Sequence, residues 1–206
     1  MSAPSDSSPR SLSDSPRIFD NPVLDRLSRI DHRLPLAVYG PLVALLAIWS
    51  ARQNGVVSTL LAAFAGYLLW TLVEYFGHRF LFHWEMRSAL GQRLHFLMHG
   101  IHHDYPSDPL RLVMPLLMSV PIMAAAAAII VPVGGPLGWP VYSGFVAGYI
   151  LYDMVHFHVH HSVPRTAIGR RLRQSHMLHH FRDPSTGYGV SAPWWDIVFG
   201  TAWQER

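Results

Sequence analysis

The sequence predicts an all-α integral membrane protein with four transmembrane helices arranged as two hairpins. Half of its 206 residues are hydrophobic, and these are concentrated in four blocks, at residues 34–50, 56–76, 112–133 and 137–157. A helix needs about 20 apolar residues, within a range of about 17–25, to cross a bilayer core, so each block is long enough. The connections within the first pair and within the second pair are short, which makes each pair a hairpin.

The N-terminal region precedes the first block and differs from it in composition. Residues 1–17 are rich in Ser, Pro and Asp, so we expect a disordered tail there and a single membrane domain over residues 18–206. Asn21 and Pro22 then provide a helix start, and apolar residues recur at helical spacing from Val23 to Leu34. An amphipathic helix at the membrane surface and a lead-in continuous with the first span both fit this pattern.

The distribution of arginine predicts the topology. The sequence has no lysine, and of its sixteen arginines only Arg52 lies in a short connection within a hairpin. The positive-inside rule therefore places both termini and both long polar segments, about 77–111 and 158–206, in the cytoplasm as a helical cap. The net charge of +3 does not indicate nucleic-acid binding, because the arginines flank apolar blocks. An all-arginine composition suggests a GC-rich bacterial genome, and hence a bacterial inner membrane.

Histidines supply the strongest functional signal. The motif HxxHH occurs twice, and each copy follows a pair of histidines at the end of an apolar block. Imidazole is the commonest neutral nitrogen ligand of transition metals, and the sequence has no cysteine to offer a thiolate. Ten nitrogens exceed the needs of one ion, so the sequence predicts a two-metal site. The ten candidate ligands are His78, His83, His99, His102, His103, His156, His160, His176, His179 and His180.

The spacing of these histidines indicates how they converge. Within each HxxHH the residues are three and four apart, so on a helix all three are expected to aim at one point. His156 and His160 are also four apart. His78 and His83 are five apart, which requires the helix to end or bend between them. The remaining histidines, expected at the surface, are His32, His95, His158 and His161.

Carboxylates inside the apolar blocks are the second signal. Glu74 lies one helical turn before His78, and Asp153 lies three residues before His156. A carboxylate at membrane depth is costly unless it has a partner, so each is a functional candidate. We expect each to accept the free ring N–H of a metal-binding histidine, which would fix the tautomer. Direct metal binding by either carboxylate stays open as an alternative.

Four segments together resemble a known family. They are WTLVEYFGHRFLFH at 70–83, LHFLMHGIHHDYP at 94–106, LYDMVHFHVHH at 151–161 and SHMLHHFRDPSTGYGVSAPWWDIVFGT at 175–201. The sequence resembles the fatty acid hydroxylase/sterol desaturase superfamily, and within it the fatty acid 2-hydroxylases that act on ceramide acyl chains. The resemblance implies a membrane di-iron oxygenase that uses O2 and electrons to hydroxylate a lipid acyl chain, with the ten histidines as ligands. It also implies that zinc can occupy the site in isolated protein.

The resemblance leaves several points open. Asp196 lies in the matching C-terminal segment, where a bracing role and a catalytic role are both possible. The eukaryotic 2-hydroxylases carry a fused cytochrome b5 domain upstream, where this chain has a polar tail. We therefore expect electrons from a separate donor, a cytochrome b5-like protein or a ferredoxin. A hydroxylase or desaturase of a sterol, carotenoid or ornithine lipid remains an alternative, as does a non-catalytic metal-binding or metal-transporting membrane protein.

Overall fold

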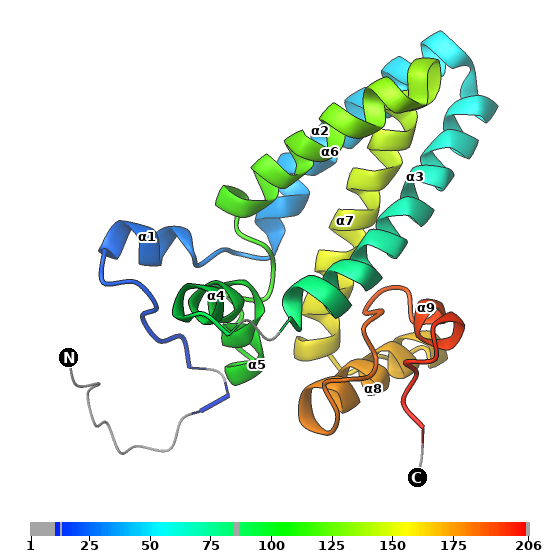
Figure 1. Cartoon of the computed structure of the whole chain (residues 1–206). Helices are drawn as coiled ribbons and strands as arrows, with labels where there is room; N and C mark the ends of the chain where they lie inside the picture. The colour runs from blue at the N-terminus through cyan, green and yellow to red at the C-terminus, as the bar shows by residue number, and fades with distance from the viewer. Residues whose placement is uncertain (1–10, 13, 85–86, 205–206) are drawn as a thin grey trace.

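The structure, a computed structural model, describes residues 11–12, 14–84 and 87–204, and every regular element among them is a helix. This confirms the predicted all-helical class. Four long helices form a bundle (Figure 1): α2 (Arg33–Asn54), α3 (Val56–Phe76), α6 (Leu116–Gly134) and α7 (Gly138–His161). Three stretches are long and apolar enough to cross a membrane, and they span Arg33–Asn54, Val56–Phe82 and Leu116–His161. The last of these contains both α6 and α7, between which the chain reverses.

Each reversal of the chain depends on a glycine in the left-handed region. Gly55, at φ 79°, separates α2 from α3, and Gly135, at φ 53°, begins the short 3-10 turn η3 (Gly135–Leu137) between α6 and α7. A residue with a Cβ rarely adopts such angles, which explains the glycines. The bundle therefore consists of two hairpins, with α7 in contact with each of the other three long helices.

Small residues allow α7 and α3 to approach closely. A Cβ added to Gly144 would lie 1.8 Å from the carbonyl oxygen of Ala63, and one added to Gly66 would lie 1.8 Å from that of Val141. Contact between backbones through small residues is a common way for helices to associate in lipid, where the hydrophobic effect gives no net attraction between them. The outer surfaces of the long helices expose large apolar side chains, as a lipid-facing bundle requires; examples are Leu45, Leu61 and Ile129.

The remaining helices gather at one end of the bundle, the lower end in Figure 1. They are α1 (Pro22–Leu27), the π-helix η1 (Gly77–Phe82), α4 (Ala89–His95), the π-helix η2 (Phe96–Gly100), α5 (Ile101–Asp104), α8 (Ala167–Phe181) and α9 (Trp194–Val198). The predicted start of α1 is confirmed: Pro22 is its first residue, and the Asn21 side chain accepts the amide of Val23 at 2.9 Å. The helix is shorter than expected and is not continuous with α2.

The predicted start of the third apolar block and the predicted extent of the tail differ from the structure. The third apolar block was expected to be helical from residue 112, but α6 begins at Leu116, after Pro115 in an extended conformation. Residues 112–115 instead line an internal cavity. Residues 1–10 and 13 of the predicted tail lie outside the described residues. The last part of that tail is bound to the rest of the protein, since the carbonyl of Pro16 accepts a bond from Arg111 at 2.8 Å.

Candidate metal centre

All ten predicted ligands lie together at the end of the bundle, in two groups of five. Within each group, one ring nitrogen from every histidine lies within 4.8 Å of the others. Nitrogens bound to one ion at about 2.0–2.1 Å lie at most about 4.2 Å apart, so each group is close to the size of a coordination shell. The first group is His78, His83, His99, His103 and His179, and the second is His102, His156, His160, His176 and His180.

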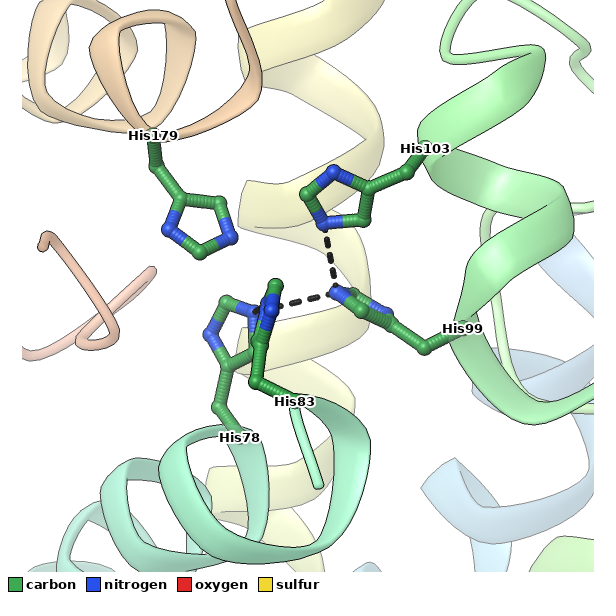
Figure 2. A group of neighbouring side chains, drawn as sticks. All are labelled: His78, His83, His99, His103 and His179. Atoms are coloured by element: carbon green, nitrogen blue, oxygen red, sulfur yellow. Dashed lines mark hydrogen bonds between the residues drawn. The ribbon is translucent and has the colours of Figure 1, made fainter. Parts of the chain in front are cut away.

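The rings of the first group point toward a common centre (Figure 2). The Nε2 atom of His99 lies 3.1 Å from Nε2 of His78 and 2.9 Å from Nε2 of His103. In the second group, Nε2 of His156 lies 2.9 Å from Nε2 of His102. The groups adjoin each other, because the ring centroids of His103 and His180 are only 4.1 Å apart.

Each HxxHH motif contributes to both groups, which corrects the expectation that its three histidines aim at one point. In the first motif the outer pair, His99 and His103, joins one group and His102 joins the other. In the second motif it is His179 that lies apart from His176 and His180. The last two histidines of each motif are adjacent in the chain, and adjacent residues on a helix point about 100° apart. Their side chains therefore diverge enough to reach different groups.

A π-helix explains how His78 and His83 reach the same group. Residues Gly77–Phe82 form the π-helix η1, and the amide of His83 donates to the carbonyl of His78 at 3.2 Å. In this geometry residues five apart lie above one another, as residues four apart do in an α-helix. The predicted bend is therefore a change of helical pitch. A second π-helix, η2, carries His99, and such segments occur frequently at functional sites.

Backbone carbonyls fix the tautomers of two rings in the first group. Nδ1 of His78 lies 2.7 Å from the carbonyl oxygen of Tyr188, and Nδ1 of His179 lies 2.6 Å from that of Thr186. A carbonyl can only accept, so each Nδ1 carries the proton and each Nε2 presents a lone pair to the group. Among the described residues nothing donates to the buried Nε2 of His179. Lone pairs converging without donors are the arrangement that a bound cation stabilises, so the residues fit a metal ion.

Burial keeps the imidazoles neutral. Loss of hydration, followed by the proximity of His179, lowers the pKa of His83 to about 3, and the same two causes lower that of His103 to about 3. The pKa of His102 is also lowered well below its usual value, first by burial and then by the neighbouring His156. Neutral imidazole is the form that binds metals, so both groups are prepared for cations without first losing protons.

Glu74 does not take the role expected of it, whereas Asp196 has the bracing contacts that were one of its two expected roles. Glu74 accepts hydrogen bonds from the Ser191 amide, at 2.7 Å, and from the Ser191 hydroxyl. The ring N–H of His78, which we expected it to accept, is taken by the Tyr188 carbonyl. Asp196 accepts the amides of Tyr188 and Gly189, both at 2.8 Å. Glu74 and Asp196 therefore hold the loop that orients His78 and act on the histidine only through the backbone.

Asp153 and the histidines expected at the surface also have defined places. Asp153 is fully buried and faces the cavity described below; among the described residues no hydrogen bond joins it to a ring nitrogen of His156. None of the three carboxylates is in either group of candidate ligands. His158 is exposed on α7, and the remaining three histidines, His32, His95 and His161, also lie outside both groups.

An apolar cavity of about 330 Å³ ends at the two groups. Its wall comes from α1, η1, α4, η2, α5, α6 and α7 and from the segments before α1 and α6, with mostly aliphatic and methionine side chains such as Leu24, Leu97 and Met118. His99, His102 and His156 also line it. A chain-like apolar molecule in this cavity would contact both groups.

The model of the fatty acid hydroxylase family matches residues 63–201, which contain all ten histidines of the two groups. The chain belongs to the fatty acid hydroxylase family. A solved structure, full-length scs7p with only its hydroxylase domain visible, superposes with a TM-score of 0.79 at 32% identity, covering 90% of this chain and 71% of that one.

Curated members of the hydroxylase family resemble the chain over most of its length. Dihydroceramide fatty acyl 2-hydroxylase FAH2 of Arabidopsis thaliana is 35% identical over 192 residues, which are 90% of this chain and 79% of the plant protein. Ceramide very long chain fatty acid hydroxylase SCS7 of Saccharomyces cerevisiae is 39% identical over 82% of this chain. The chain spans only 43% of that yeast protein, and 39% of the fatty acid 2-hydroxylase of Homo sapiens.

Two features of the hydroxylase site could not be identified by residue type. The carbonyls of Thr186 and Tyr188 orient His179 and His78, but any residue can supply a carbonyl. The division of the histidines into two groups likewise depends on how three separate segments meet. The GYGVS segment at 187–191 nevertheless lies within the stretch that carries the family resemblance, and it contains Tyr188 and Ser191.

Proposed function

We propose that the protein is a di-iron membrane oxygenase that hydroxylates carbon 2 of a lipid acyl chain, in a ceramide-like or other fatty acyl substrate. The observation that carries this proposal is the meeting of two five-histidine groups with one apolar cavity. The relatives named as ceramide and fatty acid 2-hydroxylases support the choice of carbon and substrate. When bound, the two irons would supply the activation of O2 and the oxidation of the C–H bond.

The protein's own residues would position the substrate and the ions. The ten histidines would hold two ions side by side, one in each group. Met118, Leu97 and Leu24 would hold the acyl chain by apolar contact and exclude water from it. The Tyr188 and Thr186 carbonyls would keep Nε2 of His78 and of His179 free of protons and directed at one ion.

We infer that α2, α3, α6 and α7 cross the membrane as four separate spans, with the site on the cytoplasmic side. Two features support this: the reversal between α6 and α7 within the Leu116–His161 stretch, and the arginine distribution. Both termini would then face the cytoplasm, and a bacterial inner membrane fits the all-arginine composition. Cysteine-labelling of single-cysteine variants at Arg52 and Gln174 would test this, since only Gln174 should be protected in closed right-side-out cells.

The reaction needs two electrons and two protons for each O2, because one oxygen atom enters the lipid and the other leaves as water. We propose a separate one-electron carrier, a cytochrome b5-like protein or a ferredoxin. Helix α8 supports this proposal: it carries His176, His179 and His180 toward the site and exposes Arg170 and Arg171. An acidic carrier would be attracted to these arginines, which lie on the same helix as three of the candidate ligands.

The decisive experiment uses purified protein loaded with ferrous iron and given O2, a chemical reductant and an acyl lipid carrying two deuterium atoms on carbon 2. Mass spectrometry should show a product that has gained one oxygen and lost one deuterium. Loss of two hydrogens from adjacent carbons would indicate a desaturase, and oxygen elsewhere in the chain would indicate a hydroxylase that attacks a different carbon. Protein loaded with zinc is the control and should give no product; no O2 consumption with iron would contradict an oxygenase.

A further inference from the structure

Helix α9 packs beside the end of α3, at the lower right in Figure 1. The indole N–H of Trp195 donates to the Thr71 hydroxyl at 3.1 Å, and the ring of Phe199 stacks on that of Tyr75 with centroids 5.0 Å apart. Thr71 and Tyr75 belong to the last two turns of α3, inside the apolar Val56–Phe82 stretch. At a rise of ~1.5 Å per residue, Thr71 lies ~7.5 Å before the last residue of α3. Helix α9 therefore lies at the depth of the apolar stretch and not below it.

The outer face of α9 is apolar and exposed. Its four large side chains are between 39% and 63% exposed: Trp194, Ile197, Val198 and Phe199. Residues 187–204 contain a single charged residue, Asp196, and it is 2% exposed. The ring of Phe76, on α3, lies 5.2 Å from that of Phe199 and 5.8 Å from that of Phe80, which is 58% exposed on η1. The apolar face of α9 is therefore continuous with the outer surface of α3 and η1.

The backbone around α9 is bonded within the protein, as membrane depth requires. In lipid, non-helical backbone is tolerated only where protein groups satisfy its N–H and C=O groups. The Asp196 carboxylate accepts the amides of Tyr188 and Gly189, and the Glu74 carboxylate accepts that of Ser191. The amide of Thr201 donates to the Asp196 carbonyl at 2.8 Å. The two buried carboxylates thus make an irregular segment compatible with this depth.

We propose that α9 is embedded in the cytoplasmic leaflet, with Ile197 and Val198 against lipid acyl chains and Trp194 near the headgroups. This rests on the proposed function, in which α3 crosses the membrane. The depth of ~7.5 Å is within the ~5–10 Å to which interfacial helices are buried, and tryptophan is enriched at that level. Lipid is the partner that the face fits, because it continues a surface that α3 presents to lipid and exposes no charge.

The embedded helix also connects the membrane to the metal centre. The carbonyl of Tyr188 orients His78, and the amide of Tyr188 is held by Asp196, a residue of α9 itself. A change in the position of α9 would therefore move the carbonyl that directs one candidate ligand. Lipid contact at Ile197 and Val198 would stabilise the histidine group through this segment.

Spin labelling in phospholipid nanodiscs tests the depth of α9. The sequence has no cysteine, so a nitroxide can be attached to one introduced at Ile197, with Leu61→Cys on α3 as the lipid reference and Gln174→Cys on α8 as the water reference. The Ile197 label should be relaxed by O2 as strongly as the Leu61 label and be protected from a water-soluble nickel chelate. Access to nickel equal to that at Gln174, or access to neither reagent because a second copy covers the face, would overturn the proposal. Failure of the proposed membrane crossing would differ, since nickel would then reach the Leu61 label as well.

A matched pair of charged variants tests the connection to the metal centre. Ile197→Asp should lower the Tm of zinc-loaded protein in nanodiscs by about 2–8 °C, because a carboxylate part-way into the bilayer bears part of its cost at the centre. Zinc should also be lost to a chelator faster than from the unaltered protein. Ile168→Asp, at a position 76% exposed on α8, is the control and should lower neither quantity. An unchanged Tm and an unchanged rate of zinc loss in Ile197→Asp would contradict the proposal.

Discussion

Asp196 provides the clearest test of how the loop at 187–191 supports the metal centre. Its side chain is 2% exposed and accepts three hydrogen bonds of 2.8 Å, from the amides of Tyr188 and Gly189 and from the hydroxyl of Thr201. The Tyr188 carbonyl in turn accepts Nδ1–H of His78. Replacing Asp196 by alanine would leave two buried backbone amides without acceptors and release the carbonyl that orients one ligand.

The magnitude follows from these contacts. A hydrogen bond to a charged group contributes about 1.5–3 kcal/mol, and bonds that share one acceptor are not additive, so Asp196→Ala should cost about 3–5 kcal/mol of unfolding free energy. For a chain of this length that corresponds to a fall of roughly 6–20 °C in Tm. Metal affinity should fall by about 10- to 100-fold, the usual effect of losing a group that orients a ligand.

The assay combines thermal unfolding in detergent with metal analysis after dialysis against a weak chelator. Asp20→Asn is the control, because the Asp20 side chain is exposed, and it should change neither quantity. Asp196→Asn keeps one acceptor and should give an intermediate result. If Asp196→Ala retains the Tm and the metal content of the unaltered protein, the loop does not support the histidines as argued.

Three other outcomes are expected. Gly144→Val places a Cβ 1.8 Å from an α3 backbone oxygen and should lower the free energy of unfolding by about 3 kcal/mol or more. Gly134→Ala is its control: a Cβ there meets no atom within 4 Å, so the free energy of unfolding should not change. The metal-free protein should lose stability as the pH falls from about 6.5 toward 3. The reason is that His83 and His103 have pKa values of about 3 in the folded protein but take up protons near pH 6.5 in the unfolded chain. A Tm that stays constant between about pH 7 and 5 would contradict this. His158→Ala, at an exposed position on α7, should leave metal content and activity nearly unchanged, and a complete loss would show that this face of α7 has been misassigned.

Elements determined by local chemistry could be predicted from the sequence. Asn21 and Pro22 gave the start of α1 because capping and proline geometry depend only on neighbouring residues. The long helices followed from length and apolar composition. The boundary at Leu116 could not be predicted, because residues 112–115 are apolar for a different reason: they line the cavity instead of facing lipid.

The sequence identified which residues form the candidate metal centre, but it did not show how they are arranged. The doubled HxxHH motif marked the residues that converge, but the assignment of His102 and His179 to opposite groups depends on the angle at which η2, α5 and α8 meet. The spacing of His78 and His83 showed that a regular α-helix would not suffice, without showing that a π-helix is the solution. The role expected of Glu74 was wrong because a backbone carbonyl, which no residue type signals, takes the His78 proton.

In the proposed site, ten histidines would hold two ions, and each HxxHH motif would be shared between them. Anomalous diffraction at the iron absorption edge, from crystals of iron-loaded protein, tests this most directly. Two peaks are expected, one within the group of His99 and His103 and one within the group of His102 and His156. A single peak, peaks outside both groups, or one ion bound by both His102 and His103 would contradict the account.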